Sequence, residues 1–330
     1  MKKRVIIGFI ISIIFIFFLF KTIDYAQTIT AIENFGIFSL IIGIIIYSFS
    51  FIFRTLRWQL IIRPIKEIRF TNVFYIIFIS YLFNSILPAR IGDLIRGYLL
   101  TMTEDIKFIT SISTVIFDRT LDGITLVLLF CLSLLFSGMN INFDPKLKFL
   151  IILVIFLFTL LLLIYLMDFS LILKIISPFE RISPKYSQIL INVFLNFKSG
   201  GEILKSGNLV IFKLFSYSIF VWMFEAFLFY FVLYSIGVSI SIFTLLILLA
   251  VVNFAIMIPS APGYIGTFET AFVIVLVIYG INSSLALSAA IIIHIIWFVT
   301  TILFGLISMR YLGVNIRQLI DKVKSIQNKN

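Results

Sequence analysis

A charged interruption in an apolar sequence constrains the fold more than any other feature of this chain. The predominantly apolar run Phe70–Leu87 leads directly into Pro88-Ala89-Arg90-Ile91-Gly92-Asp93-Leu94-Ile95-Arg96. Proline lacks a backbone donor, and glycine tolerates dihedral angles that other residues avoid. Each ionisable side chain costs about 2.5–3.5 kcal/mol to insert into a bilayer, and broken backbone at that depth must be satisfied by protein or water. The segment therefore predicts a polar site built on broken helices inside a membrane.

The composition supports a membrane location. Hydrophobic residues make up 62% of the 330 residues, charged residues make up 12%, and the mean hydropathy is +1.18. These values are typical of a polytopic membrane protein. We therefore predict an all-α polytopic membrane protein with about eight transmembrane helices, some of them broken or re-entrant. The whole chain, 1–330, forms a single transmembrane domain in this interpretation, with no soluble domain.

The charge and the cysteine content exclude several other classes. The formal net charge of +11 indicates basic cytoplasmic flanks that face anionic lipid, because the basic residues cluster at the ends of the apolar segments. We therefore expect no nucleic-acid partner. Cys131 is the single cysteine, so the chain has no internal disulfide and no cysteine metal cluster.

Nine apolar segments follow the basic N-terminus, and the first is interpreted as an uncleaved anchor. They are Val5–Phe20, Ile37–Phe53, Phe70–Met102, Ser111–Phe136, Leu147–Met167, Leu209–Ile236, Ile242–Ile258, Ile265–Gly280 and Leu285–Met309. After Phe53 the chain carries five basic residues against Glu67, which predicts a cytoplasmic loop. The five are Arg54, Arg57, Arg63, Lys66 and Arg69.

The number of segments creates a parity problem. Nine crossings that start inside the cell would leave the basic tail, 310–330, outside. If Phe70–Met102 is instead a re-entrant hairpin, the tail and the polar connection 168–208, which contains an amphipathic helical pattern, both become cytoplasmic. We therefore predict a multi-pass plasma-membrane protein with cytoplasmic N- and C-termini. The stretch Ile242–Gly280 remains open as two spans or as a second hairpin, because both leave the parity unchanged.

A weak internal repeat suggests that the two hairpins are related. Asn84 precedes the first break as Asn253 precedes the second, and Asp93 lies 25 residues before Asp118 as Glu269 lies before His294. In the predicted topology the two copies approach from opposite faces, as in inverted-repeat transporters with a midplane site. We expect the helix breaks at Pro88, Gly92, Pro259, Pro262, Gly263 and Gly266.

Nine ionisable residues lie in or beside the apolar segments and form the candidate substrate-binding or transport site. Asp118 and Asp122 share one helical face, and Arg119 is rotated by about 100° from Asp118, so it can contact another element. The nine are Arg90, Asp93, Arg96, Asp118, Arg119, Asp122, Glu225, Glu269 and His294.

Two interpretations of these charges remain open. In the first, the charges form buried pairs that hold broken helices together. In the second, the arginines and the helix N-termini after Pro88 and Pro262 bind a lipid phosphate, while the acids bind a cationic head group or carry coupling protons. His294 is either a packing histidine or part of this site.

Enzyme motifs are absent from the sequence. It contains no HExxH, Walker loop, nucleophile elbow or CxxC, and its single histidine excludes a histidine-rich metal site. We therefore expect no catalytic residue, no metal and no cofactor. Asp24 and Glu33 in the first outer loop are the acids available to a membrane glycosyltransferase.

Four motifs together resemble the flippase-like transmembrane domain of lysylphosphatidylglycerol synthases. They are Leu87-Pro88-Ala89-Arg90-x-Gly92-Asp93-x-x-Arg96, Asp118-Arg119-x-x-Asp122, Trp222-x-x-Glu225 and Pro259-Ser260-x-Pro262-Gly263-x-x-Gly266-x-x-Glu269. The domain forms the N-terminal part of the multiple peptide resistance factor and also occurs alone. The resemblance covers nearly the whole chain and implies a domain of about eight helices that moves a lipid between leaflets. In the full-length factor that lipid is aminoacylated phosphatidylglycerol.

Three positions depart from the pattern of this family. Asp93 stands where glutamate is common, Tyr264 where a second glycine is frequent, and His294 where arginine often occurs. We also expect no soluble aminoacyl-tRNA-dependent transferase domain, and therefore no lysyl-transfer chemistry in this chain.

The expected function is transport of a lipid cargo between leaflets. The cargo is an anionic or aminoacylated phospholipid, or a polyprenyl-linked or glycolipid precursor. The alternatives are a membrane component of aminoacyl-phospholipid or glycolipid synthesis, acting with a lipid-modifying transferase, and a structural or regulatory membrane protein. The oligomeric state is open.

Overall fold

The described part of the chain is helical, which confirms the predicted fold class. The computed structural model describes residues 24–88, 90–136, 200–257 and 261–319, and these contain no β-strand. Four of their helices are long and apolar enough to cross a membrane: α2 (Tyr25–Ile62), α5 (Phe108–Phe136), α9 (Asn208–Ser235) and α12 (Ser283–Tyr311). The expected anchor Val5–Phe20, the span Leu147–Met167, Pro259, most of the 168–208 connection and the end of the tail lie outside the described residues.

Helix α2 extends beyond the predicted segment Ile37–Phe53. It is interrupted at Gly36, whose φ of 68° and ψ of 159° are not helical, and then continues to Ile62. The predicted cytoplasmic loop is therefore wrong for Arg54 and Arg57, which are buried inside α2. They remain in the helix because acidic side chains of neighbouring helices offset their charge. Arg63 keeps an exposed side chain at the helix end.

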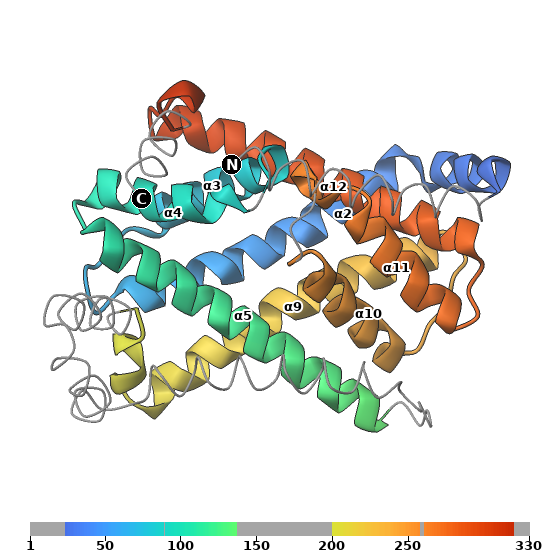
Figure 1. Ribbon diagram of the computed structural model, residues 1–330, viewed down its shortest axis with the longest axis horizontal. Coiled ribbons are helices and arrows are strands. Elements are labelled where there is room, and N and C mark those ends of the chain that lie inside the picture. Colours follow the sequence, from blue (N-terminus) through green and yellow to red (C-terminus); the bar gives the residue numbers. More distant parts are fainter. Residues whose placement is uncertain (1–23, 89, 137–199, 258–260, 320–330) are drawn as a thin grey trace, which may run out of the picture.

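The first predicted hairpin is confirmed. Helices α3 (Phe70–Ile86) and α4 (Ile91–Glu104) have 17 and 14 residues and pack against each other. At 1.5 Å per residue they reach only about 26 and 21 Å, less than the roughly 30 Å of a bilayer core. The hairpin enters and leaves at the end of the molecule where α2 ends and α5 begins (Figure 1).

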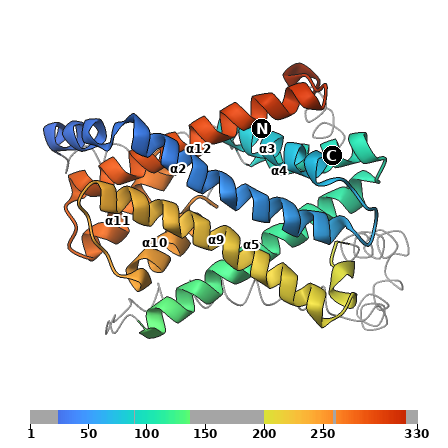
Figure 2. The same ribbon diagram turned by 180° about the vertical axis from the view of Figure 1, so that it is seen from behind.

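The open question about Ile242–Gly280 is answered by a second hairpin. Helices α10 (Ile242–Ala255) and α11 (Thr267–Ile278) have 14 and 12 residues, and the short 3-10 helix η2 (Pro262–Tyr264) lies between them. Their open end lies where α9 ends and α12 begins, opposite to the first hairpin (Figures 1 and 2). Another 3-10 helix, η1 (Glu202–Lys205), precedes α9.

The two hairpins make the chain an inverted repeat. Each half consists of a long helix, a short hairpin and a second long helix: α2 to α5 in one half, and α9 to α12 in the other. The halves run in opposite directions, and the tip of the first hairpin packs against η2 near the middle of the molecule. The end of α5 and the start of α9 accordingly lie at opposite ends (Figure 2).

Close packing supports this arrangement. A Cβ atom on Gly92 would lie 1.9 Å from the backbone oxygen of Ser80, so only glycine allows α4 to approach α3 this closely. The rings of Phe51 in α2 and Phe78 in α3 stack with centroids 4.1 Å apart. Large apolar side chains such as Phe38 are exposed on the outside of the long helices, as expected for a surface in contact with lipid.

The inverted arrangement predicts where the two ends of α2 can be labelled. Cysteines would replace Gln27 and Glu67, two exposed residues at opposite ends, in a Cys131→Ser background. We expect an impermeant thiol reagent to reach the Gln27 position from outside the cell and the Glu67 position only after the membrane is opened. Labelling of both positions from one side would contradict the fold, and the reverse pattern would contradict the predicted orientation.

Candidate functional site

Four arginines and four carboxylates form one buried network at the centre of the molecule. They come from α2, α4, α5 and α9, so the network joins both halves of the repeat. The arginines are Arg54, Arg57, Arg96 and Arg119, and the carboxylates belong to Asp93, Asp118, Asp122 and Glu225.

The two aspartates on one face of α5 hold Arg57 of α2 between them. Arg57 Nε lies 2.7 Å from Asp118 Oδ1, and Arg57 Nη2 lies 2.8 Å from Asp122 Oδ1. Arg57 has no exposed surface, so these acids balance a fully desolvated guanidinium. The shared helical face of the two aspartates, predicted from their spacing, is what makes this clamp possible.

The same carboxylate of Asp118 also fixes α4. Arg96 donates through Nη1 to Asp118 Oδ2 at 2.8 Å, and its guanidinium lies 3.8 Å from the ring centroid of Trp58. Arg96, one of the residues predicted for the substrate site, is buried within the network, with 1% exposure, and does not line the cavity described below.

Arg119 contacts other elements, as its rotation from Asp118 predicted. Its Nη2 lies 2.7 Å from Asp93 Oδ1 of α4, and its Nη1 donates to Tyr81 of α3 and to Asp122, both at 3.2 Å. The first hairpin is therefore tied to α5 by a permanently charged side chain.

Arg54 links α2 to α9 through an ion pair with Glu225. Its guanidinium carbon also lies 5.2 Å from the ring centroid of Trp222 and 5.4 Å from that of Tyr81. Arg54 and Arg57 were not among the site residues predicted from the sequence. The available signals were their helical spacing of three residues and the excess of membrane acids over the three arginines that had been recognised.

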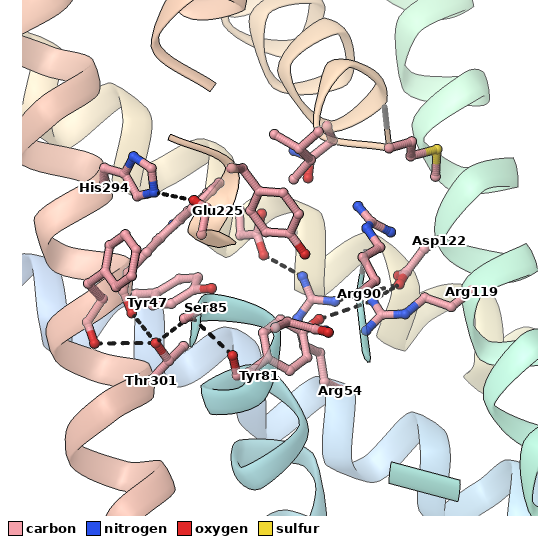
Figure 3. A pocket seen from close by; sticks show the side chains of 18 of the residues that line it. Tyr47, Arg54, Tyr81, Ser85, Arg90, Arg119, Asp122, Glu225, His294 and Thr301 are labelled. Carbon is pink, nitrogen blue, oxygen red and sulfur yellow. Dashed lines mark hydrogen bonds and ion pairs between the residues drawn. The ribbon is translucent and has the colours of Figure 1, made fainter. Parts of the chain in front are cut away.

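A small cavity of about 90 Å³ lies beside this network, where the two hairpin tips meet. Side chains from all four long helices and both tips line it, and Figure 3 shows arginines and acids gathered around it. Asn84 near the end of α3 and Asn253 near the end of α10 both contribute. These residues were predicted to be repeat equivalents, and they do occupy equivalent places.

Arg90 enters the cavity from the tip of the first hairpin (Figure 3). It forms no ion pair with another described residue, and its buried Nε lacks a hydrogen-bond partner among them. Its backbone is left-handed, with φ of 52° and ψ of 38°, a conformation that costs free energy and is concentrated at functional sites. From the opposite tip, Tyr264 (φ 64°) places its ring centroid 5.7 Å from the guanidinium carbon.

Among the described residues that line the cavity, buried donors without a hydrogen bond outnumber buried acceptors without one, which are Asn84 Oδ1 and Asp122 Oδ1. The indole Nε1 atoms of Trp222 and Trp297, like the Nε of Arg90, are buried without a partner in the described part of the chain. Buried donors without a partner cost about 1–3 kcal/mol each. An acceptor-rich group in the cavity would remove this cost.

Glu269 and His294 form a second polar contact beside the cavity. Glu269 Oε1 is hydrogen-bonded to His294 Nδ1, and its Oε2 accepts from the Gly266 backbone amide at 2.7 Å. His294 Nε2 lies 2.7 Å from the backbone oxygen of Gly263. The two residues that the repeat pairs by spacing are therefore in direct contact, and both bind the second hairpin tip.

Comparison with known proteins identifies the family. The family model described as the lysylphosphatidylglycerol synthase TM region matches residues 5–305. The chain belongs to this family.

Archaeal relatives extend the similarity over nearly the full chain. A UPF0104 membrane protein of Methanothermobacter thermautotrophicus is 23% identical and covers 94% of both chains. Two UPF0104 membrane proteins of Methanocaldococcus jannaschii are also similar. One is 24% identical over 96% of both chains, and the other is 26% identical over 71% of this chain and 95% of its own. The family and the apolar helices together establish a membrane protein.

The buried network predicts a large penalty for removing one charge. Arg57→Met leaves Asp118 and Asp122 short of a positive partner, and breaking a buried pair costs about 3–5 kcal/mol. The control is Arg63→Met, because Arg63 and Glu67 form an exposed pair worth about 0–1 kcal/mol. Thermal unfolding in detergent should separate the two variants clearly. Equal melting temperatures would contradict a stabilising role of the network.

Proposed function

We propose that this protein moves an anionic phospholipid, or another lipid with a phosphate head group, between the leaflets of the plasma membrane, with both termini in the cytoplasm. Arg90 is the residue that binds the phosphate. The observation that supports this proposal is the presence of an arginine without an ionic partner in the described residues, in a cavity between two hairpin tips.

Charge balance favours an anionic ligand. The four network arginines are matched by four carboxylates, so Arg90 supplies positive charge that the network does not offset. A guanidinium binds phosphate through a fork of N–H donors. The unpartnered indole donors would complete the coordination of phosphate or glycerol oxygens.

The acids of the site are already engaged. Glu225 pairs with Arg54, and Glu269 contacts His294. Neither carboxylate therefore stands ready for a cationic head group, which favours an anionic cargo over an aminoacylated one.

The inverted hairpins provide a route for transport. Transporters with inverted repeats expose a central site alternately by moving one repeat against the other. Here the two hairpins enter from opposite ends of the molecule, and their tips meet at the cavity. The cavity has room for a head-group phosphate and not for acyl chains, so the chains would stay in the bilayer during transfer.

Substitution of Arg90 tests the proposal. Arg90→Ala removes a charge-assisted contact worth about 1.5–3 kcal/mol, so retention of phosphatidylglycerol should fall by roughly 10- to 150-fold. Arg90→Lys should give an intermediate loss, because an ammonium lacks the planar fork. The folded yield should be unchanged, since Arg90 is not part of the ion-pair network. Native mass spectrometry of the purified protein with defined lipids measures the retention.

Arg310→Ala is the matched control, because Arg310 is an exposed arginine at the end of α12, away from the cavity. It should retain phosphatidylglycerol like the unsubstituted protein. Equal retention by Arg90→Ala and Arg310→Ala would contradict the proposed phosphate site.

A further inference from the structure

The two hairpins carry acids at equivalent positions but with different partners. Asp93 is the third residue of α4, and Glu269 is the third residue of α11. Asp93 is paired with Arg119, which stays charged at any physiological pH, whereas Glu269 is paired with His294. The first tip is therefore held by a fixed charge, and the second is held by a group that can gain or lose a proton.

The hydrogen bonds of His294 determine how many protons the contact needs. The backbone oxygen of Gly263 can only accept, so His294 Nε2 must carry a proton. The contact between His294 Nδ1 and Glu269 Oε1 needs one more proton, on either atom. Without it, two lone pairs would face each other in a buried site, and the contact would be repulsive.

We propose that His294 and Glu269 form a proton-binding site, and that the bound proton holds the second hairpin tip closed over the cavity. The proton is taken from water and shared between the imidazole and the carboxylate. Its release leaves a carboxylate facing a neutral imidazole and frees the tip. The proton-binding site itself does not depend on the proposed function. A role for this proton in coupling to transport does rest on the proposed function.

The second tip packs directly against this contact. A Cβ atom on Gly263, whose φ is +67°, would lie 2.2 Å from Cζ of Phe298. Phe298 lies one helical turn after His294 in α12. The imidazole and the Phe298 ring also stack, with centroids 4.8 Å apart. Loss of the proton would therefore disturb Gly263, and with it Tyr264, which meets Arg90 across the cavity.

The other ionisable groups that line the cavity are arginines, the carboxylates paired with them, and tyrosines. Arg54 with Glu225, and Arg119 with Asp122, form ion pairs. The remaining groups that share the cavity with His294 are Arg90 and the phenols of Tyr47, Tyr81 and Tyr264. A phosphate bound by Arg90 would make proton release from the dyad less favourable, because release adds negative charge. By linkage, proton binding would then strengthen phosphate binding to the same degree.

The single histidine of the chain makes the proton directly observable. The only imidazole signals of protein labelled with ¹⁵N-histidine and held in nanodiscs come from His294. In the closed state at low pH we expect Nε2 to carry a proton and Nδ1 to share one with Glu269, and we expect the imidazole to lose one proton as the pH rises. A closed state in which the imidazole is neutral, with its proton on Nδ1 and a bare Nε2, would overturn the proposal, because Nε2 could not then donate to Gly263.

Glu269→Gln separates the proton from the shape of the site. A glutamine amide can donate to a neutral Nδ1 while its oxygen still accepts from Gly266, so it imitates the protonated pair. The tip distance would be measured by spin labels at Ile86 and Ile265, two exposed residues at the two tips, in a Cys131→Ser background. The distance should increase between about pH 5 and about pH 9 in the unsubstituted protein and stay constant in Glu269→Gln.

A pH-dependent distance that persists in Glu269→Gln, or a constant distance in both proteins, would overturn the proposal. His294→Phe should give the open distance at every pH, because it removes both hydrogen bonds. These measurements require neither bound lipid nor transport. Failure of the Arg90 phosphate site would leave them unchanged, and their failure would leave the Arg90 result unchanged.

Discussion

The clamp of Asp118 and Asp122 on Arg57 is the interaction on which the arrangement of the helices depends. It places a carboxylate pair of α5 against a fully buried guanidinium of α2, at 2.7 and 2.8 Å. Desolvation of such groups offsets much of their attraction, so the pair makes sense only as part of a balanced network. Arg96 and Glu225 extend the balance to α4 and α9, and the network thereby fixes which helices meet at the centre.

Because the charges of the network balance, the charge of Arg90, which lies outside the network, requires a separate explanation. Arg90 lies at a hairpin tip in a left-handed conformation and enters the cavity without an ionic partner in the described chain. A stabilising role would have placed its guanidinium against a carboxylate, as for Arg57 and Arg96. Its position between two tips that enter from opposite ends instead suits a ligand that brings its own negative charge. We therefore assign structure to the arginines paired with carboxylates and ligand binding to Arg90.

Much of the architecture could be predicted because it follows from patterns along the chain. Apolar length and parity predicted the α3–α4 hairpin, and the break at Pro88 lies between α3 and α4 as expected. The shared spacing of 25 residues predicted that Glu269 corresponds to Asp93 and His294 to Asp118. In the structure Glu269 and His294 are in contact. Helical period alone placed Asp118 and Asp122 on one face.

The partners of the charges could not be predicted in the same way. Arg54 and Arg57 follow an apolar segment and obey the positive-inside pattern, so the local sequence favours a cytoplasmic loop. Only the packing of α2 against α5 and α9 shows that Asp118, Asp122 and Glu225 form ion pairs with these two arginines. Arg96 and Arg90 are six residues apart and look alike in the sequence, yet one is buried in the network and the other lines the cavity. That difference arises from tertiary contacts of α4, which no local pattern encodes.

The central claim is that the protein carries an anionic head group across the bilayer through the cavity between the two tips. It is tested most directly by the transfer rate of a labelled anionic phospholipid between the leaflets of proteoliposomes, compared with a labelled zwitterionic phospholipid of the same chain length. We predict faster transfer of the anionic lipid than in protein-free vesicles, with little effect on transfer of the zwitterionic lipid. Equal acceleration of both lipids, or acceleration of neither, would contradict it.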